Sequence, residues 1–125
     1  MDEHRLRRLL MGGAALELAA AAGIVSGAAP DVLLVDAAAK SSATFRRLWV
    51  AFLLVLAASR AAAAASRART TFRLTLFIHV VELAFFWREA YDRAREGTLD
   101  ARGRVLVAAV LIIPASMLLV GPSEP

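Results

Sequence analysis

The sequence predicts an all-α integral membrane protein, a four-helix bundle with short loops in which residues 1–125 form a single transmembrane domain. Hydrophobic residues make up 59% of the 125 residues and the mean hydropathy is +0.61, whereas soluble domains are about 45–50% apolar. Four apolar runs with basic residues at their ends occupy most of the chain. A membrane-spanning helix needs roughly 20 predominantly apolar residues, so the runs leave little room for a soluble domain.

The four apolar runs predict helices at about residues 9–29, 46–66, 72–96 and 104–121. The first run is long enough to span a membrane, and the others reach that length with charged flanks whose side chains can extend to the interface. A helix of a soluble bundle shows a polar stripe at helical period. The fourth run lacks one, since Ser116 is its only polar side chain between residues 106 and 120. We therefore favour the membrane class over a soluble helical bundle.

The first run also fits a secretory signal peptide, because it follows a basic start and ends in small residues near Ala28. Glu17 lies in the middle of this run. A carboxylate is out of place in the apolar region of a signal peptide, so we favour a retained helix.

The basic residues do not define the orientation of the predicted helices in the membrane. They flank the runs on both sides, so the positive-inside rule gives no clear orientation. Two inserted hairpins with a weak charge bias explain this, and a dual-topology dimer, as in tiny multidrug exporters, is the alternative.

The Arg and Ala bias of the composition is typical of a GC-rich bacterial genome, so we expect a bacterial cytoplasmic membrane. The pI of about 11.0 would suit nucleic acid, but arginines at the ends of apolar runs indicate lipid instead.

The composition also limits the chemistry. Cysteine is absent, which excludes disulfides, thiolate metal sites and a cysteine nucleophile. The sequence has two histidines and no glycine-rich phosphate loop. We therefore expect no cofactor and no metal.

The first predicted helix carries small residues four apart. This ridge consists of Ala15, Ala19, Gly23 and Gly27. Such spacing lets another backbone approach closely, which is how membrane helices associate. The ridge predicts contact with a second copy or with other membrane proteins, although an alanine-rich chain also produces such spacings by chance.

Four ionisable residues fall inside the predicted spans, namely Glu17, Arg60, His79 and Glu82. At about 1.5 Å per residue, all four lie roughly 9–13 Å from the same face of a membrane about 30 Å thick. They can therefore meet in one intramembrane polar layer. We expect Arg60 to bridge the two carboxylates, and His79 to bond to one of them.

This polar layer has three interpretations. The first is a structural clasp that fixes helix register. The second is a proton-coupled transport site in a homo-oligomer, with Glu17 or Glu82 titrating and His79 relaying protons. The third is a lipid-modifying enzyme in which His79 and a glutamate act as acid and base. A clasp predicts that a Glu17–Arg60 swap still folds, whereas a transporter or enzyme predicts a folded but inactive Glu82→Gln protein.

The order of polar and aromatic features resembles the ergosterol biosynthetic protein 28 family. The stretches that carry the resemblance are Ala43-Thr44-Phe45, Trp49, Arg60, and His79-Val-Val-Glu82 followed by Phe85, Phe86 and Trp87. They cover about residues 43–91. The chain departs from the family in lacking its first arginine, in a longer Trp-to-Arg spacing and in a shorter His-to-Glu spacing. The resemblance implies a membrane scaffold that gathers sterol- or lipid-synthesis enzymes, without catalysis by His79 or Glu82.

These observations favour a non-catalytic scaffold or accessory subunit of the membrane. A small proton-coupled transporter is the alternative, followed by the lipid-modifying enzyme.

Overall fold

The computed structural model describes residues 1–27, 42–66 and 68–122. Over these ranges the chain forms four α-helices and no strand. They are α1 (Glu3–Ser26), α3 (Ala43–Ser66), α4 (Arg69–Arg95) and α5 (Ala101–Val120). The predicted all-α class is confirmed for this part of the chain. Each of the four helices is long and apolar enough to cross a membrane.

The first helix differs from the predicted range at its start. It begins at Glu3 instead of near residue 9, because Asp2 caps it by accepting a hydrogen bond of 2.8 Å from the backbone N–H of Arg5. Leu6 in this added segment is fully buried. The helix ends at Ser26, since Gly27 adopts the left-handed conformation at φ 73°. The last two residues of the predicted range, 28 and 29, lie outside the described residues.

The other helices agree more closely with the predicted ranges. Helix α5 begins three residues earlier than predicted, at Ala101, where the side chain of Asp100 accepts a hydrogen bond of 2.8 Å from the N–H of Gly103. The connection between α4 and α5 is short, as predicted, and turns at Gly97 with φ 70°. The predicted loop between the first two helices lies mostly outside the described residues.

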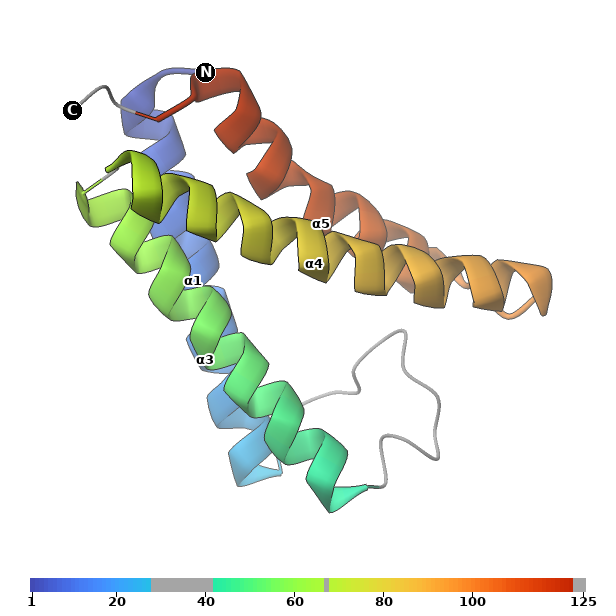
Figure 1. The fold of residues 1–125 in the computed structure, drawn as a ribbon. Coiled ribbons are helices and arrows are strands. Elements are labelled where there is room, and N and C mark those ends of the chain that lie inside the picture. Colours follow the sequence, from blue (N-terminus) through green and yellow to red (C-terminus); the bar gives the residue numbers. More distant parts are fainter. Residues whose placement is uncertain (28–41, 67, 123–125) are drawn as a thin grey trace.

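The four helices form two antiparallel hairpins, α1 with α3 and α4 with α5. Helix α1 packs on α3, α3 on α4, α4 on α5, and α5 again on α1. The hairpins converge at the end where α1 begins and α5 ends, and they separate toward their other ends (Figure 1). A buried cluster fills the converging end, made of Leu6, Leu10, Ala63, Ala64, Phe72, Ile113 and Met117.

An aromatic cluster connects the hairpins farther from the termini. The ring of Trp49 on α3 lies 5.7 Å from the rings of both Phe85 and Phe86 on α4, and it meets Phe86 edge to face. Edge-to-face pairs add roughly 0.5–1.5 kcal/mol to the stabilisation from buried area. Phe86 also packs with Val110 of α5. Trp49 therefore ties the first hairpin to the second where their backbones move apart.

Candidate functional site

The guanidinium of Arg60 lies at the centre of the structure. Arg60 is 5% exposed, and its side chain extends from α3 toward α1 and α4. Nη1 donates to the carbonyl of Gly13 at 3.2 Å and to Oε1 of Glu17 at 2.5 Å. Nη2 donates to Oε2 of Glu82 at 3.4 Å, and Nε donates to Nε2 of His79 at 2.9 Å. All three nitrogens of one side chain thus join three helices.

The hydrogen-bond partners of His79 show which of its two ring nitrogens carries the proton. Nδ1 lies 2.8 Å from the carbonyl oxygen of Thr75, which can only accept, so Nδ1 carries the hydrogen. Nε2 faces Nε of Arg60, which can only donate, so Nε2 presents its lone pair. His79 is therefore a neutral imidazole with both nitrogens occupied. The sequence predicted a bond from His79 to a carboxylate, but the structure places Arg60 there.

A hydrogen bond from Thr75 adds a further link between α4 and α3. Its side-chain hydroxyl donates to the carbonyl of Ser59 on α3 at 3.0 Å. Thr75 is 1% exposed and His79 is 0% exposed. This hydrogen bond holds α4 against α3 at the residue that precedes Arg60.

The two carboxylates come from different helices and share one guanidinium. Glu17 lies on α1 and Glu82 on α4, and Arg60 stands between them. Each carboxylate uses one oxygen for Arg60. Among the described residues, no donor contacts Oε2 of Glu17 or Oε1 of Glu82. The cluster holds two carboxylates, one guanidinium and one neutral imidazole, so it carries one excess negative charge when both carboxylates are ionised.

Gly13 is a site residue that the sequence analysis missed. A Cβ atom at this position would lie 2.9 Å from Cδ1 of Ile113, and 3.2 Å and 3.3 Å from Nη1 and Cδ of Arg60. The absence of a side chain lets the arginine reach the helix backbone. A signal for this role was available, since Gly13 stands one helical turn before Glu17 and shares its face.

A cavity of about 830 Å³ opens beside the cluster, between the two hairpins. Its walls come from all four helices and are mostly apolar, whereas Glu17, Arg60 and Glu82 form a polar patch on one wall. His79 does not line it. The cavity-facing residues of α1 are Arg8, Leu9, Gly12, Gly13, Leu16, Glu17, Ala20 and Ile24, and those of α5 are Leu106, Ala109, Val110, Ile112 and Ile113.

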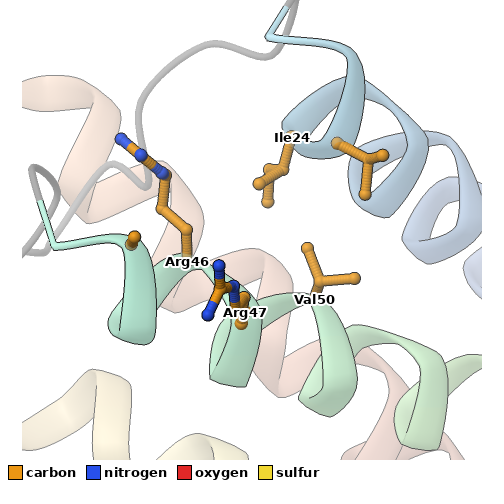
Figure 2. Close-up of a pocket in the computed structure, with 6 residues that line it drawn as sticks. Ile24, Arg46, Arg47 and Val50 are labelled. Carbon is orange, nitrogen blue, oxygen red and sulfur yellow. The ribbon is translucent and has the colours of Figure 1, made fainter.

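A second, smaller hollow lies between the end of α1 and the start of α3 (Figure 2). Its volume is about 330 Å³. Ile24 and Val50 face it from the two helices, and Arg46 and Arg47 stand at its rim with exposed side chains. The hollow is separate from the Arg60 cluster, and no buried polar side chain lines it.

The predicted ridge lies away from the site. Ala15 and Ala19 are exposed, Gly23 is half-buried, and Gly27 forms the C-cap of α1. Helix α1 contacts the rest of the described chain through another face, which includes Leu6, Leu10 and Ala14. The role of the ridge in contacts with another chain therefore stays a prediction.

The described residues offer no site for a metal ion. No three His, Asp or Glu side chains group closely enough there to hold one, and Arg60 takes one oxygen of each carboxylate of the cluster.

Comparisons with protein-family models, with curated proteins and with solved structures give no match to this chain.

Proposed function

We propose that this chain is a multi-pass protein of the bacterial cytoplasmic membrane and acts as a non-catalytic scaffold or accessory subunit. The observation that carries the proposal is the Arg60 cluster. It connects α1, α3 and α4 and uses all three nitrogens of the guanidinium within the chain. Groups arranged in this way hold helices in register, which is the role of interhelical hydrogen bonds in membranes.

The distribution of polarity supports insertion into a bilayer. The charged cluster is buried inside, whereas large apolar side chains cover the outside of all four helices. Examples are Val25 of α1 at 76%, Leu48 of α3 at 65%, Phe77 of α4 at 63% and Leu119 of α5 at 79%. Soluble monomers rarely expose large contiguous apolar patches. Lipid tails would cover such a surface without penalty.

The geometry of His79 argues against the enzyme hypothesis. A general acid or base must lie within hydrogen-bond reach of the reacting proton. His79 is 0% exposed, does not line the cavity, and has both nitrogens occupied by Thr75 and Arg60. The same occupancy argues against a proton relay through this side chain.

The scaffold role also rests on the resemblance of residues 43–91 to the ergosterol biosynthetic protein 28 family. That resemblance implies that the partners are enzymes of sterol or lipid synthesis. The exposed part of the small-residue ridge, Ala15 and Ala19, offers a surface where a partner helix can approach closely.

Gentle extraction from the native membrane, followed by mass spectrometry of co-purifying proteins and lipids, tests the scaffold. We expect stoichiometric lipid- or sterol-synthesis enzymes. Ala19→Ile, which makes the ridge bulkier, should remove them, whereas Ala108→Ile on the exposed part of α5 should not. A homo-oligomer without any protein partner contradicts the scaffold role.

The cavity favours one second candidate, a small homo-oligomeric proton-coupled transporter. Glu17 and Glu82 both border the cavity, so a bound substrate and a proton can compete for them. Proton flux into proteoliposomes that contain a pH-sensitive dye distinguishes the two functions. A transporter gives substrate-dependent flux that Glu82→Gln abolishes, and a scaffold gives none.

A further inference from the structure

We propose that the cavity between the two hairpins binds an amphipathic organic cation, that is, an ammonium or similar cation joined to an apolar body. This inference concerns a ligand of the cavity, and it does not depend on the scaffold role. It stands on the shape of the cavity, on the polarity of its walls and on the charge of its polar patch.

The size and the walls of the cavity suit the apolar body. Ligand pockets usually have volumes of about 300–1,000 Å³ and mostly apolar walls, and this cavity measures about 830 Å³. Leu9 and Leu16 of α1, Leu53 of α3 and Leu106 of α5 line it. Trp49 and Phe86 add aromatic surface, which attracts cations through the ring faces.

The charge of the polar patch selects a cation. Two carboxylates, Glu17 and Glu82, share the single guanidinium of Arg60, and His79 behind it is neutral. Helix α5 contributes only apolar side chains to the cavity. When both carboxylates are ionised, the patch carries one unbalanced negative charge. Such a charge is poorly tolerated in apolar surroundings, because burial removes its hydration.

Arg8 does not balance this charge. It lies nine residues before Glu17 on α1, which is about 13 Å along the helix axis. Its side chain is exposed at the rim and contacts Nε2 of His4 through Nε at 3.0 Å and through Nη2 at 2.6 Å. Within the described part of the chain, one oxygen of Glu17 and one of Glu82 therefore remain available to a positive group that enters the cavity.

A pair of probes with the same shape and opposite charge tests the proposal. Tetraphenylphosphonium and tetraphenylborate are added separately to the purified full chain in a neutral detergent. The chain has two tryptophans, so Trp87→Phe leaves Trp49 at the cavity wall as the single tryptophan reporter. We expect saturable quenching by the phosphonium, and binding of the borate weaker by about tenfold or more, because like charges oppose each other.

Two variants connect binding to this cavity. Glu17→Gln should weaken phosphonium binding by about tenfold, since it removes the excess charge. Ala20→Leu places a larger apolar side chain in the cavity and keeps every charge of the Arg60 cluster, and it should also weaken binding. Ala22→Leu on the opposite, exposed side of the same helix is the matched control and should bind as the parent does. Ala20→Leu keeps the test decisive if Glu17→Gln fails to fold.

Three results overturn the proposal. They are no phosphonium binding, equal binding of the borate, and equal binding by Ala20→Leu and Ala22→Leu. A nanodisc that contains stearylamine distinguishes the source of the cation. Competition by stearylamine with the phosphonium supports a lipid amine as the occupant, and phosphonium binding without competition supports a free organic cation.

Discussion

Arg60 on α3 and Glu17 on α1 form a partly buried ion pair across 2.5 Å, although they are forty-three positions apart in the sequence. Removing two charges from water is unfavourable, and the pair persists only where hydrogen bonds satisfy the remaining polar atoms. Arg60 meets that condition through Gly13, His79 and Glu82. The pair therefore cannot be separated from the rest of the cluster, which leads to the first prediction.

Arg60→Met should destabilise the protein by about 3–5 kcal/mol, because the buried carboxylate of Glu82 and the partly buried carboxylate of Glu17 lose the guanidinium that they share. The triple variant Glu17→Gln/Arg60→Met/Glu82→Gln should recover much of this loss, since it removes the uncompensated charges. Unfolding by sodium dodecyl sulfate, followed by circular dichroism, measures the free energy of unfolding. The matched control is Arg88→Met, which breaks an exposed pair with Asp92 and should cost less than about 1 kcal/mol. Equal effects of Arg60→Met and Arg88→Met would contradict the clasp.

The structure changes the meaning of the charge-swap test. A glutamate at position 60 would face Glu82 and the lone pair of His79, because Arg60 donates to both in the native chain. The exchange of Glu17 and Arg60 therefore should not restore folding. The neutral triple variant replaces it as the test of a structural role.

Gly13→Ala should destabilise the protein by about 1–3 kcal/mol, the usual range for overpacking. Its Cβ would lie 2.9 Å from Cδ1 of Ile113 and 3.2 Å from Nη1 of Arg60. Gly12→Ala is the neighbouring control. No atom lies within 4 Å of its Cβ, so it should stabilise the helix by up to about 1 kcal/mol.

A double-mutant cycle with Ile113→Val separates the two contacts of Gly13. Valine lacks Cδ1, so it should relieve part of the Gly13→Ala defect, and the remainder belongs to Arg60. The same detergent unfolding assay applies. Equal stabilities of Gly12→Ala and Gly13→Ala would show that the close approach is unimportant.

Several features of the cluster follow from the sequence alone. The rise per residue fixes how deep a side chain lies along a helix, which is why Glu17, Arg60, His79 and Glu82 were expected at one level. The class of the fold follows as directly, because apolar runs of this length with charged ends leave few alternatives.

Other features depend on the rotation and packing of the helices. The depth of a side chain along its helix does not define them. The partner of His79 is one example, since Arg60 occupies the position expected for a carboxylate. Gly13 is another, because its role appears only when α5 places Ile113 against α1. The early start of α1 is a third example, because hydropathy marks only the apolar residues, whereas the capping contact of Asp2 determines the first turn.

The cap at Asp2 should respond to pH only in strong acid. The hydrogen bond from the backbone N–H of Arg5 lowers the pKa of Asp2 below its ordinary value of 3.8. Because the pKa of Asp2 is lower in the folded state, its ionised carboxylate stabilises the start of α1 fully above pH 3.8. This stabilisation is lost as the pH falls through the folded-state pKa. The chemical shift of the Arg5 amide should follow that titration. In Asp2→Asn, which caps without titrating, the shift should stay constant, and an unchanged titration in this variant would contradict the assignment.

Cysteine labelling should place the start of α1 and the end of α5 on one side of the membrane. The chain has no cysteine, so single substitutions report without background. The start of α1 and the end of α5 lie at the converging end of the hairpins (Figure 1), and the α4–α5 turn lies at another end. Glu3→Cys and Pro122→Cys should therefore react with an impermeant maleimide from the same side, and Thr98→Cys from the opposite side.

The same labelling distinguishes one orientation from two. The arginines on both sides of the runs leave the orientation open, so the labelling pattern decides between the alternatives. With a single orientation, each site reacts completely from one side of sealed vesicles. In a dual-topology dimer, about half of the molecules react from each side at all three sites. Complete labelling of all three sites from one side contradicts four membrane spans. With four spans, the bilayer separates Thr98→Cys from the other two sites.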